Sequence, residues 1–321
     1  MKHSGTNLRS LYVDRLHFLS PKLDDSSKND VSVRSTDYAR TIESVQHLLD
    51  GLYPREVRQT EGLEVRVRPL EDENMHPDPS CASLNAATKQ FRQTVQQTLG
   101  PETNALLRKF KHLGADETKN PLRQIHRLYD LSSCMQAHGL GLPKDVSPED
   151  VERMEHITTN QWWMIYDSSE SLATLAIGRM LKDVKEQIMT SVENRQGKVK
   201  LGLFSGHDST IAPVLSALDA FGGKYPGFAA MIQFELFTLT APPSLTSRLI
   251  RPFQQPQHYI RMLYNGKPIT LPACSKKGDH LDGNPSMCTL QAFMKKVDSM
   301  VPKDYEGMCR SEERVESEWK D

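Results

Sequence analysis

The chain has 321 residues, 37% of them hydrophobic, and its 40 basic residues are balanced by 41 acidic ones. This length and apolar content are sufficient for one large domain or a core with an insertion, and they exclude a chain that is disordered overall. A formal net charge of −1 argues against a dedicated nucleic-acid-binding protein, which would carry a basic surplus. A small anionic ligand remains compatible, because it needs only a local patch of positive potential.

Membrane insertion and secretion are also disfavoured. No run of the sequence approaches the roughly 20 apolar residues of a membrane-spanning helix. The first ten residues, MKHSGTNLRS, lack the apolar stretch of a secretory signal peptide. We therefore expect no transmembrane segment and a cytoplasmic or mitochondrial location rather than a secreted one, with any targeting segment lying upstream of Met1. The oligomeric state is left open.

The first 74 residues predict the beginning of an α/β core. A β-type stretch over 30–33 leads into RSTD at 34–37, and a helix follows over 38–52 with apolar residues at helical spacing. Residues 64–70 alternate valines with arginines, which predicts another strand. The segment 75–165 is mostly helical and polar and is interpreted as a cap insertion.

The core resumes over 166–310. A helix over 171–193 has the apolar stripe Leu172, Ala176, Met180, Val184 and Ile188, which is typical of a core-facing helix. A strand over 198–205 leads into SGHDST at 205–210 and a further helix, and two more strands are expected over 228–237 and 258–265, the second ending in the turn signal Asn265-Gly266. The last residues, 311–321, are expected to be a charged tail. Alternating strands and helices predict a three-layer α/β/α core with a mainly parallel sheet.

Two segments place charged or imidazole side chains where an apolar strand ends and a helix begins. These are VSVRSTD at 31–37 and VKLGLFSGHDST at 199–210. In open α/β sheets, ligands bind beyond the carboxyl ends of the strands, where helix N-termini favour anions. If the two strands are neighbours, Arg34 and His207 converge on one point and suit a phosphoryl group, and Asp208 is placed to protonate a departing alkoxide.

The alternative is purely structural. Arg34 would be a solvated charge, Asp37 a helix N-cap, and His207 a core histidine beside a capping aspartate. Three further histidines, His126, His138 and His156, lie in the insertion without metal-ligand spacing, so we expect no metal and no cofactor. Trp162-Trp163 favours packing between cap and core, with an aromatic contact to substrate as the alternative.

The five cysteines form no C-x-x-C pair, and buried free thiols are the simplest interpretation. Cys274 and Cys288 bracket a loop rich in turn-forming residues, which makes them the best candidates for a disulfide. The odd total leaves at least one thiol unpaired.

The sequence resembles the histidine acid phosphatases, the second branch of the histidine phosphatase superfamily. VRSTDYARTIESVQHLLDGLYP (33–54) is similar to their R-S-T-D-x-x-R-T-x-x-S segment, and LFSGHDSTIAPVLSALDAF (203–221) to their H-D segment. FELF (234–237) and the stretch 259–297 resemble their later strands and cysteine-bracketed loop. HPDPSCASL (76–84) and SSCMQAHGLGLP (132–143) resemble the branch with the lysophosphatidic acid phosphatases.

The resemblance implies a phosphoglycerate mutase-like fold and a metal-free phosphomonoesterase. It implies that Arg34 and His207 bind phosphate and that Asp208 is the proton donor, while a histidine of an R-H-G-x-R-x-P motif forms a phosphohistidine. It also implies disulfides Cys274–Cys288 and Cys81–Cys309, with Cys134 free. A mitochondrial or cytosolic location would disfavour both disulfides.

One element of the family pattern is missing. No R-H-G-x-R-x-P occurs in the 321 residues, and LRSLYVDRLHFL (8–19) resembles the family helix that follows this motif. We therefore expect Met1 to lie beyond the first strand and this chain to have no nucleophile, since His3 lacks the preceding strand and the flanking arginines. The sequence predicts a phosphomonoester hydrolase of doubtful activity. The alternatives are an inactive phosphate-binding relative and a helical interaction protein without a site.

Overall fold

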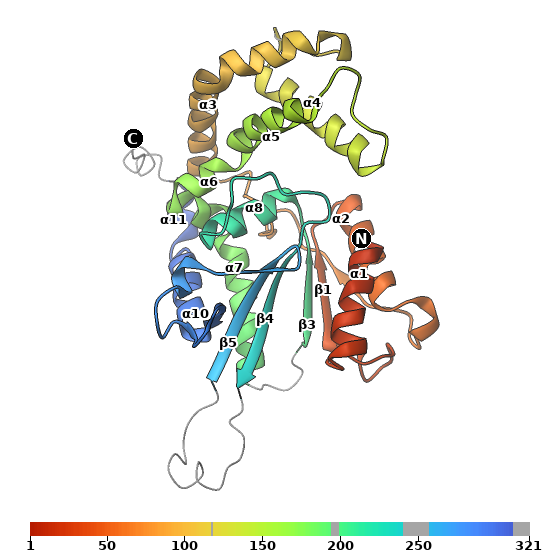
Figure 1. Ribbon diagram of the computed structural model, residues 1–321. Helices are drawn as coiled ribbons and strands as arrows, with labels where there is room; N and C mark the ends of the chain where they lie inside the picture. The colour runs from red at the N-terminus through yellow and green to blue at the C-terminus, as the bar shows by residue number, and fades with distance from the viewer. Residues whose placement is uncertain (117, 194–198, 240–256, 311–321) are drawn as a thin grey trace, which may run out of the picture. The chain divides into compact units, whose positions relative to one another are not determined.

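The structure is a computed structural model that describes residues 1–116, 118–193, 199–239 and 257–310 (Figure 1). Its contacts define two compact units. Unit 1 comprises Met1–His76, Arg179–Ile211 and Ala229–Val301. Unit 2 comprises Pro77–Gly178, Ala212–Phe228 and the residues from Pro302 on. The helical segment expected over 75–165 thus falls almost wholly in unit 2, and the tail expected over 311–321 lies outside the described residues.

A three-stranded parallel sheet lies at the centre of unit 1. Its order is β2 (Val65–Arg66), β1 (Val31–Ser35) and β3 (Leu201–Ser205). Val31 and Val33 of β1 are buried and lie in register with Leu201 and Leu203 of β3. The strand predicted over 64–70 is only two residues long, so β2 is a short edge strand rather than a full member of the sheet.

A second, antiparallel sheet of unit 1 has the order β4-β5-β8-β7, with β6 paired to β5. The strands are β4 (Ile232–Leu239), β5 (Gln257–Tyr264), β6 (Lys267–Ile269), β7 (His280–Leu281) and β8 (Asn284–Thr289). Asn265 and Gly266 both have positive φ and form the predicted two-residue turn between β5 and β6. The α/β class is confirmed, and among the described strands parallel pairing is confined to β1, β2 and β3.

Helices of unit 1 lie on both faces of the parallel sheet. Apolar side chains of α1 (Lys2–Leu8), the π-helical turn Arg9–Arg15 and α2 (Ala39–Leu52) form one core with Val31 and Val33. Gly202 points to the opposite face because side chains alternate along a strand, and there it lies against Gln187 of α7 (Glu170–Val192). On the antiparallel sheet, α10 (Leu290–Ser299) packs against β5 and β8.

The predicted helices α2 and α7 are confirmed in place. The five apolar residues of the α7 stripe are all less than 10% exposed. The first helix differs from the prediction, because it begins at Lys2 rather than at residue 8 and continues as a π-helix from Arg9.

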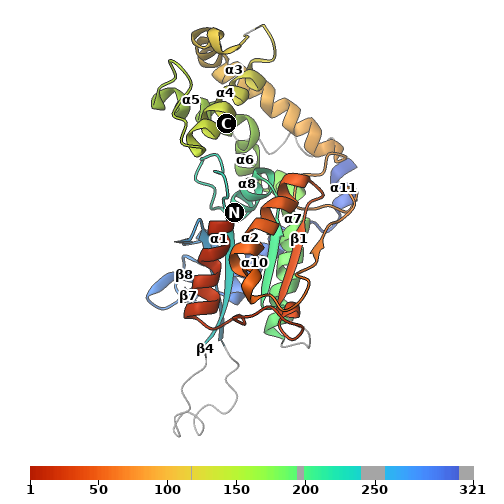
Figure 2. The same ribbon diagram turned by 90° about the vertical axis from the view of Figure 1, so that its right-hand side faces the viewer.

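Two glycines allow α1 to lie directly against α2, as Figure 2 shows. A methyl group on Gly51 would overlap the Lys2 carbonyl, and one on Gly5 would overlap the Leu48 carbonyl. At this crossing, backbone packs on backbone, so no side chain can be accommodated between the two helices.

Unit 2 is mostly helical and has its own core. Its helices are α3 (Ala82–Lys109), α4 (Pro121–Ala137), α5 (Pro148–Trp162), α6 (Met164–Ser168) and α11 (Tyr305–Arg310), together with the beginning of α7 and the end of α8 (Asp208–Ala217). Phe110, Ile125, Met154 and Ile157 are fully buried between α3, α4 and α5. No helix among the described residues is long and apolar enough to span a membrane.

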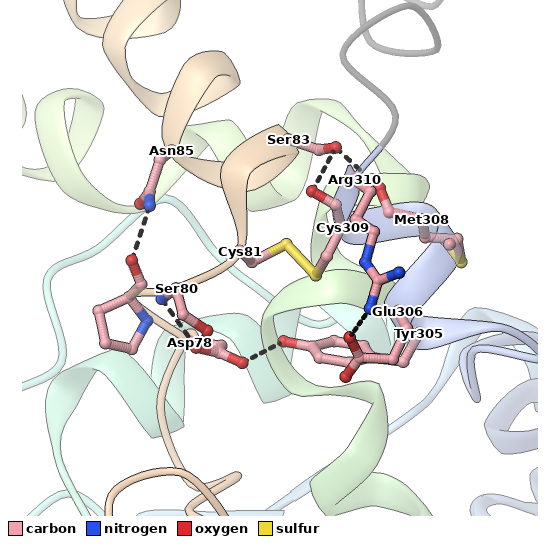
Figure 3. Close-up of a disulfide and its surroundings, with 12 residues drawn as sticks. Asp78, Ser80, Cys81, Ser83, Asn85, Tyr305, Glu306, Met308, Cys309 and Arg310 are labelled. Carbon is pink, nitrogen blue, oxygen red and sulfur yellow. Dashed lines mark hydrogen bonds and ion pairs between the residues drawn. A yellow bond between two sulfur atoms is a disulfide. The ribbon is translucent and has the colours of Figure 1, made fainter.

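Each unit contains one disulfide. Cys274 is bonded to Cys288 in unit 1, and Cys81 to Cys309 in unit 2, while the Cys134 thiol is free. Figure 3 shows how the Cys81–Cys309 bond joins the start of α3 to α11, 228 residues later in the chain. Ser83 Oγ donates to the Met308 and Cys309 carbonyls at 2.8 and 3.0 Å, which closes the same junction with hydrogen bonds.

We expect Gly51→Ala to lower the free energy of unfolding by roughly 1–3 kcal/mol, because the added methyl group forces α1 away from α2. Without this contact, the same change in a helix interior would stabilise the protein by roughly 0.5–1 kcal/mol. Denaturant unfolding gives the sign, with Gln46→Ala on the exposed face of α2 as the control. A stabilised Gly51→Ala variant would refute the close crossing.

Candidate active site

The parallel pairing of β1 with β3 brings the two predicted motifs to one edge of the sheet. Ser35, the last residue of β1, is in register with Ser205, the last residue of β3. The Thr36 N–H donates to the Ser205 carbonyl at 3.1 Å, which continues this pairing beyond the strands. The segments RSTD and SGHDST therefore start side by side at the carboxyl ends of the strands, where open α/β sheets bind ligands (Figure 1).

His207 is at the centre of the resulting cluster. Its Nε2 lies 2.9 Å from Thr36 Oγ1, and its Nδ1 lies 3.3 Å from Arg40 Nη2. The Tyr38 ring stands edge-on to the imidazole at 5.1 Å between centroids, and the His76 ring lies at 6.1 Å. The Arg40 guanidinium lies over the Tyr38 ring at 4.6 Å, which holds its long side chain against the site.

The hydrogen bonds of His207 define its tautomer. Arginine is only a donor, so Nδ1 must accept from Arg40 and the ring proton must be on Nε2. Nε2–H then donates to Thr36 Oγ1. Thr41 Oγ1 donates to the carbonyls of Thr36 and Tyr38, so the Thr36 hydroxyl is the donor in its 2.9 Å contact with Thr41. This relay fixes a neutral imidazole with its lone pair facing Arg40.

The surroundings of His207 favour the neutral ring. Burial lowers its pKa below the usual value, and the positive charges of Arg40 and His76 lower the pKa further. The carboxylates of Asp208 and Glu73 act in the opposite direction but do not outweigh these causes. In the ligand-free protein, the imidazole is therefore neutral at neutral pH. A bound anion would favour its protonated form.

The backbone of His207 is held by the turn that precedes α8. Its N–H donates to Thr210 Oγ1 at 2.9 Å, and the Thr210 hydroxyl donates in turn to the Met75 carbonyl. A side chain at Gly206 would overlap that of Thr210, so only glycine fits immediately before the histidine. Asp208, the first residue of α8, accepts the Ser209 N–H at 2.8 Å, and its carboxylate complements the positive end of the helix dipole.

Arg34 has a different environment from the one predicted. It is 9% exposed, its Nη1 donates to Asp183 at 2.6 Å, and its Nη2 donates to Glu73 at 3.3 Å and to the Asn74 side chain. Arg68 also lies 2.9 Å from Asp183. These interactions hold three of the five donors of Arg34, and the contacts described for it do not include His207.

The two arginines differ in their electrostatic effect. In the cluster around Arg34, two guanidinium groups face the carboxylates of Asp183 and Glu73, so the charges balance. No carboxylate among the described residues lies within ion-pair distance of Arg40, and its side chain is exposed. The positive potential beside His207 therefore comes mainly from Arg40.

Sequence reasoning brought His207 and Asp208 to this place but missed Thr36, Tyr38, Arg40 and His76 as members of the cluster. Arg40 had a signal, since an arginine in the first turn of a helix at a strand end lies next to the same ligand-binding edge. His76 had none, because the irregular segment after β2 that carries it has no periodic pattern.

The other candidates lie away from this cluster in the chain and have partners in unit 2. The His126 ring lies 5.5 Å from Trp162, and Trp163 lies 5.6 Å from Tyr225. Both indoles therefore contact other aromatic rings within unit 2. The described part of the chain contains no group of three or more histidine, cysteine or acidic side chains arranged to hold a metal ion.

We expect Arg40→Gln to raise the pKa of His207, because the substitution removes a positive charge that now opposes protonation of the ring. An NMR titration of the histidine ring protons, with the resonance assigned through His207→Gln, measures the change. Arg66→Gln removes an exposed arginine of the same unit and should leave the titration unchanged. A pKa that stays the same or falls in Arg40→Gln would contradict the described contact.

Comparisons with known proteins agree with this geometry. A family model described as the histidine phosphatase superfamily (branch 2) matches residues 1–265. A probable acid phosphatase of Schizosaccharomyces pombe is 25% identical, with 95% of this chain and 73% of that protein aligned. Human lysosomal acid phosphatase is 26% identical over 88% of this chain and 65% of its own length. Lysophosphatidic acid phosphatase type 6 of Pongo abelii is 27% identical over 97% and 67%.

Solved structures show the same fold. The phytase of Citrobacter braakii superposes with a TM-score of 0.63 at 15% identity, covering 96% of this chain and 88% of that one. The phytase of Klebsiella sp. ASR1 gives a TM-score of 0.64 at 13% identity, covering 95% and 85%. These structures share the α/β architecture, and the matched family covers residues of both strand-end motifs. The chain belongs to the histidine phosphatase superfamily, branch 2, whose members named above include acid phosphatases.

Proposed function

We propose that this chain binds the phosphoryl group of a small organic phosphate monoester at the shared edge of β1 and β3 and serves its hydrolysis. The observation that carries the proposal is the contact of His207 with both Thr36 and Arg40, which unites the two strand-end motifs in one cationic cluster. Membership of a family with named acid phosphatases supports the same reaction class.

Within this site, the geometry favours Arg40 over Arg34 as the guanidinium that binds phosphate. Arg40 is exposed and lies beside His207, whereas Arg34 is buried and paired with two carboxylates. A guanidinium presents parallel N–H donors that match the oxygens of a phosphoryl group. An oxyanion that took a proton onto His207 Nδ1 would replace the Arg40–His207 contact by charge-assisted hydrogen bonds from both side chains.

Asp208 is proposed as the general acid. When the P–O bond of the ester breaks, the departing alkoxide needs a proton, and Asp208 follows His207 directly at the start of α8. The site needs neither a metal nor a cofactor for this role, because the cationic cluster can stabilise the developing charge on the phosphoryl oxygens. Its partner is thus a small phosphate monoester, with no nucleic acid involved.

The reaction also requires a nucleophile, which the family resemblance assigns to the R-H-G-x-R-x-P motif. The printed sequence does not contain this motif. We therefore propose that the 321 residues bind phosphate but hydrolyse esters near the background rate. This absence also favours a second candidate function, that of a phosphate-ligand-binding relative in which Asp208 has no proton-donor role.

The relatives suggest a class of substrate and a compartment. Similarity to a protein named lysophosphatidic acid phosphatase type 6 supports a lysophospholipid or another organic phosphate. The two disulfides favour an oxidising compartment over the cytoplasm or the reduced matrix expected from the sequence, because cytosolic thiols are kept reduced.

Binding and proton donation can be separated with inorganic phosphate and p-nitrophenyl phosphate. We expect His207→Gln to weaken phosphate binding, followed by calorimetry, roughly 10- to 100-fold, because a charge-assisted hydrogen bond is lost. Asp208→Asn should bind phosphate at least as well as the unmodified chain, since a negative charge is removed from beside the anion. An unmodified chain that fails to bind phosphate would refute the proposed function.

Imidazole added to the solution tests the catalytic role, because it can replace an absent histidine nucleophile. We expect imidazole to accelerate ester hydrolysis by the unmodified chain and expect Asp208→Asn to lose roughly 100-fold or more of that rate. Equal rescue in both would exclude Asp208 as the donor, and no rescue in either would favour the binding-only function. Turnover without imidazole that is lost in Asp208→Asn would show that a nucleophile is present after all.

A further inference from the structure

Arg34 shapes the irregular segment that follows β2. Its Nη2 donates to Glu73 Oε1 at 3.3 Å and to the Asn74 side chain. The same Glu73 oxygen accepts the backbone N–H groups of Asn74 at 2.8 Å and Met75 at 2.7 Å. One carboxylate oxygen therefore joins the guanidinium of β1 to the backbone turn at 73–75.

This turn continues to His207. The Met75 carbonyl accepts from the Thr210 hydroxyl, and Thr210 Oγ1 accepts from the His207 N–H at 2.9 Å. The next residue of the same segment, His76, lies beside the His207 ring. Hydrogen bonds thus connect Arg34 to the backbone of His207 through Glu73, Met75 and Thr210, without a gap filled by solvent.

Burial makes this connection stiff. Glu73 is 3% exposed, Met75 is fully buried and Thr210 is 5% exposed. A buried carboxylate that loses its cationic partner is strongly destabilised, so the turn must rearrange if Arg34 is changed. On its other side, Arg34 is fixed by Asp183 of α7, which also accepts from the Asn74 side chain at 3.0 Å. The turn is therefore held from β1 and from α7 at once.

We propose that Arg34 is a positioning residue, which places His207 for phosphate binding through the Glu73–Met75 turn and the Thr210 hydroxyl. This inference rests on the proposed phosphate site and assigns to Arg34 a role other than direct contact with the anion. The imidazole is thus set from two sides, by the Thr36 relay at its ring and by Thr210 at its backbone.

The test compares Arg34→Lys, Thr210→Val, their double variant and the conservative Thr210→Ser. We expect both single variants to shift the His207 amide and ring resonances in NMR spectra and to weaken inorganic phosphate binding roughly 10-fold. The double variant should bind no more weakly than the weaker single variant, because both changes break one connection. Thr210→Ser retains the hydroxyl and should resemble the unmodified chain.

Gly51→Ala is the control for general destabilisation, since it should lower stability without shifting the His207 resonances. The inference is overturned if Arg34→Lys leaves those resonances unchanged, or if the losses in phosphate affinity add in the double variant, as expected for a direct ligand. If the unmodified chain binds no phosphate, the proposed function fails, while the His207 resonances still decide whether Arg34 positions this residue.

Discussion

The parallel pairing of β1 with β3 is the constraint on which the site depends. Two segments about 170 residues apart in sequence end in register, so their polar residues meet at one sheet edge. A slip of one residue would turn Val31 and Val33 away from the core shared with α1 and α2, which makes the register costly to change. The apolar faces that stabilise the sheet therefore also align Thr36 with His207.

Two arginines close together in sequence have different chemical environments. Arg34 is the penultimate residue of β1 and is surrounded by acceptors on α7 and on the turn after β2, so its charge is balanced inside the protein. Arg40 is in the first turn of α2 and has an aromatic ring and an imidazole as its neighbours. A charge without a carboxylate partner is the one that can attract an anion. Burial, rather than position in a motif, thus separates the structural arginine from the proposed binding one.

Much of this arrangement could be predicted from the sequence. Apolar periodicity predicted α2, α7 and β3, and the placement of His207 and Asp208 directly after a strand predicted the edge at which they lie. The partners of Arg34 could not be predicted, because Glu73 and Asn74 lie in an irregular segment and Asp183 lies on a helix distant in sequence. The antiparallel second sheet was also missed, since β4 and β5 have the same apolar character as strands of a parallel sheet.

The central claim is that a neutral His207, with its proton on Nε2 and its Nδ1 lone pair facing Arg40, awaits an anion. Nitrogen-15 NMR of the labelled imidazole ring measures this directly, with and without inorganic phosphate. The account predicts a protonated Nε2 and an unprotonated Nδ1 in the free protein near neutral pH, and protonation of both nitrogens when phosphate binds. A ring with its proton on Nδ1, or one whose nitrogen shifts ignore saturating phosphate, would contradict it.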